Sequence, residues 1–211
     1  AWSDNPALCV RDYLTATGYG LGEANANIND TAFIAAANIC DETNTDAGTT
    51  RYTANGAFTT GATPQDLLEG LITSMGATLW YTQGAWNVKA AKWTSTVLDL
   101  NEDDLRSGIS LATRHSRRDN FNTVNGTFRG DESNWQVTDF PPVTNAAFVT
   151  ADGGLESTLD MDLPFTDNSI ESRRIARIML ERNRQQLQFQ ASFGLRAFQV
   201  QTGDNVRITN T

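Results

Sequence analysis

The sequence is poor in the residues that build metal and catalytic centres. Its 211 residues include two cysteines, Cys9 and Cys40, and a single histidine, His115. A catalytic triad or a His-based metal site would depend on His115 alone, and the arginines around it would keep its imidazole neutral. The sequence therefore predicts no catalytic residue, no metal site and no bound cofactor. Each cysteine lies on the apolar face of an expected helix, so buried thiols are expected, with a disulfide between them as the alternative.

Long hydrophobic runs are absent as well. No apolar stretch approaches the roughly 18 residues that would suggest a membrane span, so no membrane insertion is expected. The sequence has no initiator methionine and no secretion signal, and it stops at Thr211 directly after a strand-like run. We therefore expect a fragment of a longer protein.

Positive charge is scarce and almost entirely carried by arginine. The chain has 25 acidic and 16 basic residues, for a net charge of −9, and Lys89 and Lys92 are its only lysines. A net negative charge argues against stable nucleic-acid binding, because such binding needs Lys and Arg to neutralise phosphates. The planar guanidinium of arginine suits fixed ion pairs at interfaces. This composition favours a protein that assembles with other proteins.

The first part of the sequence predicts a small α/β unit at residues 1–98. Three helices are expected, because each has a start signal followed by apolar residues at helical spacing. A β-hairpin follows, with its turn at Gln83-Gly84. The expected elements are helices at 6–17, 31–40 and 64–75, a weak strand at 51–58, and hairpin strands at 77–81 and 85–89.

The second part, 99–211, is expected to be rich in strands with one helix. The helix lies at about 168–184 and begins with a capping box of Asn168 and Glu171. One face of this helix is expected to carry Ile175, Ile178, Met179 and Arg182. Strand-like runs occur at 107–112, 121–128, 155–163, 186–193 and 205–209. Strands with one helix indicate a β-barrel-like domain, so the fold class is α+β, with a small α/β unit followed by this domain.

Two groups of charged residues are candidate functional features. Arg114, Arg117 and Arg118 form a basic patch suited to dock an acidic surface of a partner, and charge reversal of Arg117 and Arg118 in a binding assay would test this. Asp160 and Asp162 are two residues apart on an expected strand, so their carboxylates share one face, as a hydrolase or a cation site would need. A half-exposed strand gives the same alternation without any function, and we favour that interpretation.

Several stretches, in order along nearly the whole chain, resemble one family: the tail tip attachment, or central tail hub, proteins of long-tailed phages such as lambda and of prophages. The stretch at 121–128 and those at 134–136 and 139–143 resemble the signature of the family's third domain. The order of the stretches is more specific than any one of them. The resembling stretches are 5–14, 19–22, 35–42, 51–56, 121–128, 134–136, 139–143, 163–166 and 200–206.

The resemblance implies a structural, non-enzymatic part of the virion tail tip, assembled in the bacterial host cytoplasm. It implies a ring of three chains that joins the tail tube through a distal tail protein, surrounds the tape measure protein and carries receptor-binding fibres during DNA delivery. Trp135, in the third-domain signature, joins Arg114, Arg117 and Arg118 as a candidate interface residue. Three copies that each carry a net charge of −9 would surround an acidic lumen, which would repel DNA phosphates and ease passage.

The family's first barrel-like domain, and its large region after the position of Thr211, have no counterpart in this sequence. Host recognition usually lies in that later region, so receptor binding by this part of the protein is not expected. The alternative comes from another class of protein. It is a monomeric carbohydrate-binding module or hydrolase that uses the face of Asp160 and Asp162 together with exposed tryptophans.

Overall fold

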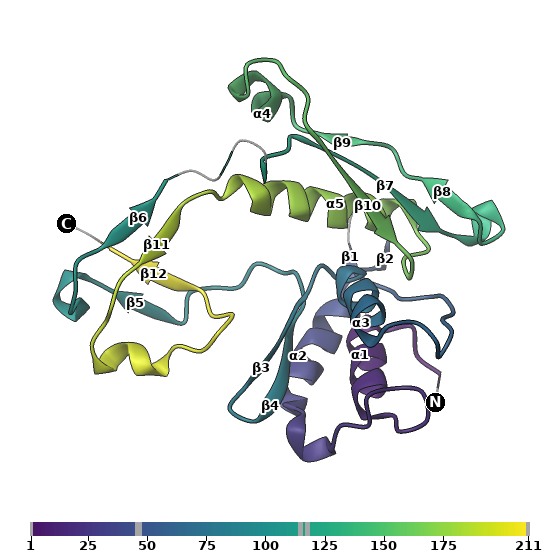
Figure 1. Cartoon of the computed structure of the whole chain (residues 1–211), viewed down its shortest axis with the longest axis horizontal. Helices are drawn as coiled ribbons and strands as arrows, with labels where there is room; N and C mark the ends of the chain where they lie inside the picture. The colour runs from purple at the N-terminus through teal and green to yellow at the C-terminus, as the bar shows by residue number, and fades with distance from the viewer. Residues whose placement is uncertain (1, 45–47, 114–115, 117–118, 210–211) are drawn as a thin grey trace. The chain divides into compact units, whose positions relative to one another are not determined.

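The computed structural model describes residues 2–44, 48–113, 116 and 119–209. Its contacts divide the chain, which Figure 1 traces from end to end, into two compact units. The first unit comprises Ala1–Ala91 and Phe121–Arg182, and the second comprises Lys92–Asn120 and Asn183–Thr211. The units are interleaved along the chain, whereas the domains predicted at 1–98 and 99–211 are consecutive.

Helices and a hairpin open the first unit, as the sequence predicts. Asn5 caps the first helix, because its Oδ1 accepts hydrogen bonds from the N–H groups of Ala7 and Leu8, at 3.1 and 3.4 Å, while Pro6 occupies the first turn. The hairpin is antiparallel and turns at Gln83-Gly84, where both residues have positive φ. The elements are α1 (Pro6–Thr15), η1 (Asn25–Asn27), α2 (Asp30–Cys40), α3 (Pro64–Thr73), β3 (Thr78–Thr82) and β4 (Ala85–Lys89).

The segment between α2 and α3 ties several elements together. It forms no strand at 51–58, so that prediction is wrong. Within this segment, the two short strands β1 (Thr43–Asn44) and β2 (Thr49–Thr50) precede residues 51–58. The N–H groups of Ala54 and Asn55 donate to the carbonyls of Asp4 and Phe165, at 2.7 and 2.8 Å. The extended backbone therefore finds its hydrogen-bond partners in separate elements rather than in one neighbouring strand.

Both thiols are free. Cys40 is fully buried on α2, its Sγ lies 3.8 Å from the Sδ of Met75, and burial raises its pKa to about 12. Cys9 is half-buried on α1, and burial raises its pKa as well. The buried thiol expected at Cys40 is confirmed, and a raised pKa keeps the thiol protonated and poorly nucleophilic at neutral pH.

A four-stranded sheet forms the other layer of the first unit. Strand β7 lies at its centre, because β10 pairs with it in parallel while β8 and β9 pair with it in antiparallel orientation. The strands are β7 (Thr123–Arg129), β8 (Val137–Asp139), β9 (Val143–Thr144) and β10 (Thr158–Leu163). Helix α4 (Ala146–Ala151) connects β9 to β10, and α5 (Ser169–Arg184) runs along the sheet in Figure 1. Val124 and Leu163 of the sheet share a buried core with Ile175 of α5.

Helix α5 buries a different face from the one predicted. Its buried residues are Glu171, Ser172, Ile175, Ala176 and Leu180. Ile175 is correctly placed, but Ile178 and Met179 are half-buried and Arg182 is exposed. Small side chains at Ser172 and Ala176 let the helix approach its neighbours closely, and such residues give little hydropathy signal. The prediction of the buried face is therefore wrong, because the observed buried face is rotated about the helix axis relative to the predicted one.

The second unit consists of short strand pairs. The part predicted to be barrel-like, 99–211, divides between the two units, and its described residues form the open sheet of β7 to β10 and separate strand pairs rather than a closed barrel. The β-barrel-like form is therefore wrong, although the α+β class is confirmed. The strands of the second unit are only three residues long, and Leu100 is the one buried apolar residue in the described part of that unit. Such strands offer no continuous apolar face to wrap into a barrel. The elements are β5 (Leu98–Leu100), η2 (Glu102–Asp104), β6 (Ser110–Ala112), β11 (Gln188–Gln190), η5 (Leu195–Gln199) and β12 (Val206–Ile208), with β5 parallel to β12 and β6 antiparallel to β11.

The helices of both units are short or polar. Across the described ranges, none combines the length and the apolar character that a bilayer-crossing helix needs.

Candidate functional site

A tightly bonded turn of the first unit presents Trp135 at the surface. The turn links η4 (Asp131–Ser133) to β8, and Trp135 is 52% exposed. Asn134 and Trp135 both have left-handed backbones, with φ of 53° and 61°, a conformation that costs about 1 kcal/mol for each non-glycine residue. A position maintained against that cost must be fixed by other contacts.

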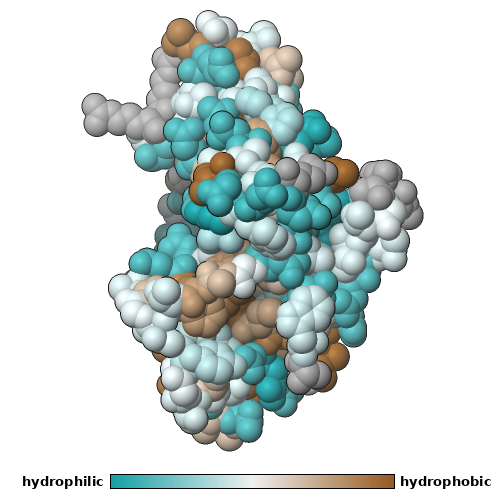
Figure 2. All heavy atoms as spheres, turned by 90° about the vertical axis from the view of Figure 1, so that its right-hand side faces the viewer, coloured by the Kyte–Doolittle hydropathy of each residue, from teal (hydrophilic) through white to brown (hydrophobic). Residues whose placement is uncertain are grey.

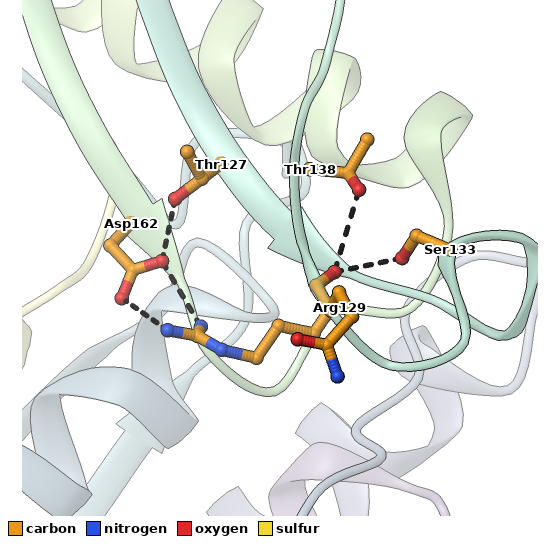
Figure 3. A network of polar contacts seen from close by, with 6 residues as sticks. Thr127, Arg129, Ser133, Thr138 and Asp162 are labelled. Atoms are coloured by element: carbon orange, nitrogen blue, oxygen red, sulfur yellow. Dashed lines mark hydrogen bonds and ion pairs between the residues drawn. The ribbon is translucent and has the colours of Figure 1, made fainter.

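Hydrogen bonds within the turn supply those contacts. The Trp135 N–H donates to the Gly130 carbonyl at 2.8 Å. The Ser133 hydroxyl is 3.0 Å from the Gly130 carbonyl and 2.8 Å from the Gln136 carbonyl, and the Thr138 hydroxyl donates to Gln136 as well. Figure 3 shows Ser133 and Thr138 converging on one carbonyl oxygen. These hydrogen bonds hold the backbone of Trp135 in one conformation and so fix the point from which the indole leaves the turn.

An ion pair lies beside this turn, across the parallel strands β7 and β10. The register pairs Asp162 with Thr127, and Arg129 lies two residues further along β7. The Arg129 guanidinium bonds both carboxylate oxygens of Asp162, at 3.1 and 3.2 Å, and the Thr127 hydroxyl donates to the same carboxylate at 2.7 Å (Figure 3). The Asp162 carboxylate thus accepts three hydrogen bonds, two of them from a cation.

The predicted pair of carboxylates on one strand face is confirmed in placement. Asp160 and Asp162 are both exposed along β10, while Met161 between them is half-buried. The carboxylate of Asp162 is bound by Thr127 and paired with the Arg129 cation. This geometry suits a cross-strand link and does not favour a hydrolytic pair.

Replacing Asp162 with asparagine is expected to lower the free energy of unfolding by only about 0.5 kcal/mol, because the paired side chains are 31% and 53% exposed. Urea unfolding of the native chain and the variant would measure this difference. Asp160→Asn on the same strand face is the matched control, for which no change is expected. A loss several times larger for Asp162→Asn would contradict this expectation, because it would mean that the Arg129–Asp162 ion pair contributes far more to stability than an exposed pair does.

A cavity of about 610 Å³ opens beside the ion pair and the turn. It is lined by Asn55, Gly56, Ala57, Arg129, Trp135 and Pro164. The Asn55 side chain donates to the Asp167 carboxylate at 2.8 Å, which fixes one wall of the cavity. An exposed tryptophan next to an arginine, at the edge of a shallow cavity, is the combination that most often anchors a protein–protein interface.

The other predicted interface residues cannot be added to this surface. Arg114, Arg117 and Arg118 lie outside the described residues, as does His115, so the basic docking patch stays a prediction. Trp135 is the one predicted interface residue within the described ranges. No group of three or more His, Cys, Asp or Glu side chains in those ranges is arranged to hold a metal ion.

Two further hollows of the first unit were not predicted from the sequence. One, of about 1100 Å³, is largely apolar, and Figure 2 shows hydrophobic surface gathered on the side that carries the N-terminal segment. Its aromatic lining comprises Trp2, Tyr13, Tyr19, Phe58 and Phe165. The other, of about 760 Å³, is lined by four arginines from two separate parts of the chain. The spacing of Arg173 and Arg177 on one helix face was the available signal, but the approach of Arg51 to them depends on the tertiary fold.

Comparison with known proteins gives a structural neighbour. No family model matches the sequence, and no curated protein matches it. Among solved structures, a chain from the virion of a native gene transfer agent particle matches with a TM-score of 0.59 and 17% sequence identity, over 92% of this chain and 46% of that chain. The two chains share a fold. This chain thus spans less than half the length of its virion neighbour, and the resemblance seen in the sequence is confirmed at the level of the fold.

A second solved structure is more distant. The 43 kDa tail protein of prophage MuSo2 from Shewanella oneidensis matches with a TM-score of 0.34 and 18% identity, over 63% of this chain and 37% of that chain. A score this low carries no argument about the fold of the present chain.

Proposed function

We propose that this chain is a structural part of a phage or phage-like particle, the middle of the central hub at the tail tip. The observation that carries the proposal is the fold shared with a virion chain over 92% of the present chain. The ordered stretches that resemble tail hub proteins support the specific position at the tip. The Trp135 surface supports a role in assembly, because an exposed indole on a hydrogen-bonded turn, lining one cavity with Arg129, suits contact with a neighbouring protein.

The second unit adds support for assembly with other chains. Trp93, Leu195 and Phe198 are 84%, 88% and 89% exposed, while Leu100 is the single buried apolar residue among those described there. A unit with so little core is stabilised when a neighbouring chain covers its apolar side chains. In the proposed hub, three copies form a ring that binds the distal tail protein, surrounds the tape measure protein and carries the fibres. The net charge of −9 per copy would line the DNA path with negative charge.

Immunogold electron microscopy of purified particles would test the position. An antibody raised against this chain is expected to label the tail end farthest from the head. Particles from cells that lack the gene are the control, and they should show neither gold nor the complete tip. Gold on the head, or particles without the protein, would contradict the proposal.

Light scattering of the complete protein would test the ring separately. A mass of three chains is expected. If the complete protein stays monomeric at the concentrations at which particles assemble, the threefold ring is excluded. The location in the virion would not be affected by that result, because the microscopy tests it separately.

A further inference from the structure

The first unit carries a groove that gathers positive charge on an otherwise acidic chain. The groove has a volume of about 760 Å³. Its lining includes Arg173, Arg174 and Arg177 of helix α5, the segment 142–146, and Arg51. Glu181 is the single acidic residue among the described residues that line it. We propose that this groove binds an acidic peptide segment of a partner protein.

The helix places these arginines by its spacing. Arg173 and Arg177 are four residues apart and therefore share one face of α5. The opposite face is buried, as Glu171 and Ile175 show, so the arginines must point away from the core. Both Arg173 and Arg177 are exposed, and the described part of the chain offers neither of them an ion-pair partner.

The other two arginines are held in place. The Arg174 Nη1 donates to the Arg51 carbonyl at 2.6 Å, which links α5 to the chain segment that carries Arg51. The Arg51 guanidinium contacts the Glu42 carboxylate at 2.9 Å, so its charge is partly neutralised within the chain. The groove therefore combines two arginines that are held by contacts within the chain, Arg51 and Arg174, with two exposed cations, Arg173 and Arg177, that have no ion-pair partner among the described residues.

Carboxylates are the chemical groups that this arrangement fits best. Guanidinium groups bind carboxylates through two parallel hydrogen bonds. Successive acidic side chains of an extended peptide could therefore engage Arg173, Arg177 and Arg174 along the helix. Duplex DNA is a poorer match, because its run of phosphates would extend beyond the groove and be repelled by the rest of a chain with a net charge of −9, whereas a short peptide can stay within the groove. The inference rests on the charge and shape of the groove, and it holds or fails independently of the tail-tip role.

Titration calorimetry with a synthetic hexaglutamate peptide would test the proposal on the full chain. Binding to the native chain is expected, with affinity that falls as salt is raised. The double variant Arg173→Gln, Arg177→Gln should bind about tenfold or more weakly. It should fold normally, because both side chains are exposed, and circular dichroism would verify this. The matched control, Arg196→Gln with Arg207→Gln, removes the same charge from the second unit and should bind as the native chain does.

Three results would overturn the proposal. One is the absence of peptide binding to the native chain at low salt. Another is an equal loss of affinity in the groove variant and in the control, which would reflect net charge alone. The last is tighter binding of a 20-base-pair DNA duplex that depends on Arg173 and Arg177, because the groove would then belong to a nucleic-acid surface.

Discussion

Replacing Gly126 with alanine is expected to lower the free energy of unfolding of the first unit by about 3 kcal/mol. Gly126 lies in the central strand β7, paired with Met161 of β10. A Cβ at this position would lie 2.3 Å from the Met161 carbonyl oxygen and 2.8 Å from a ring carbon of Phe140. Phe140 is buried, and the carbonyl belongs to the neighbouring backbone. The methyl group can be accommodated only if β10 moves away from β7, which weakens the sheet.

Urea unfolding followed by tryptophan fluorescence would measure the effect as a lower midpoint at unchanged slope. Gly61→Ala is the matched control in the same unit, because nothing lies within 4 Å of a Cβ at Gly61. Its free energy of unfolding should change by less than about 0.5 kcal/mol. Equal midpoints for Gly126→Ala and the native chain would show that the two strands are not packed as closely as described.

The local features of the fold were predictable from the sequence. Asn5 with Pro6 signals the start of α1, and Gln83-Gly84 signals the hairpin turn, because each signal acts within a few residues. The positions of most strands in the second part were also found. Their partners were not, because β12 pairs with β5 about a hundred residues earlier in the chain. Local patterns contain no information about such pairing.

The candidate site shows the same division. Trp135 could be singled out from its stretch, and the shared face of Asp160 and Asp162 follows from strand alternation. That Arg129 would occupy Asp162 depends on the register of β7 and β10, which no pattern within either strand specifies. The sequence therefore indicated which side chains share a surface and could not indicate which of them neutralise one another.

Glu171 has the position of a local capping residue in the sequence but makes a long-range contact in the structure. The sequence predicts a capping box with Asn168, and Asn168 does cap α5, since its Oδ1 accepts from the Ile170 N–H at 2.8 Å. The Glu171 carboxylate accepts instead from the N–H and the hydroxyl of Thr53, at 2.8 and 2.9 Å. Glu171 is only 4% exposed. The capping-box prediction is therefore wrong for Glu171, which joins α5 to the segment between α2 and α3.

The burial of Glu171 should make the stability of the first unit depend on pH. Removal from water raises its pKa from 4.5 to about 8, against the opposing effect of the Thr53 hydrogen bonds. The folded chain therefore keeps a proton that the unfolded chain releases between these values. The sign follows directly: the stabilisation is complete below about pH 4.5 and is lost as the pH rises to about 8. The loss amounts to about 5 kcal/mol.

Unfolding in urea at several pH values between 5 and 8.5 would measure this decline. Glu171→Gln should remove most of it, because the amide is neutral throughout, its oxygen can accept from the Thr53 N–H, and its NH2 can donate to the Thr53 hydroxyl. Glu181→Gln, an exposed position on the same helix, is the matched control and should decline as the native chain does. A Glu171→Gln variant that keeps the native slope would assign the decline to another group. A large destabilisation of that variant at pH 5 would show instead that the buried carboxyl is needed for packing rather than for its proton.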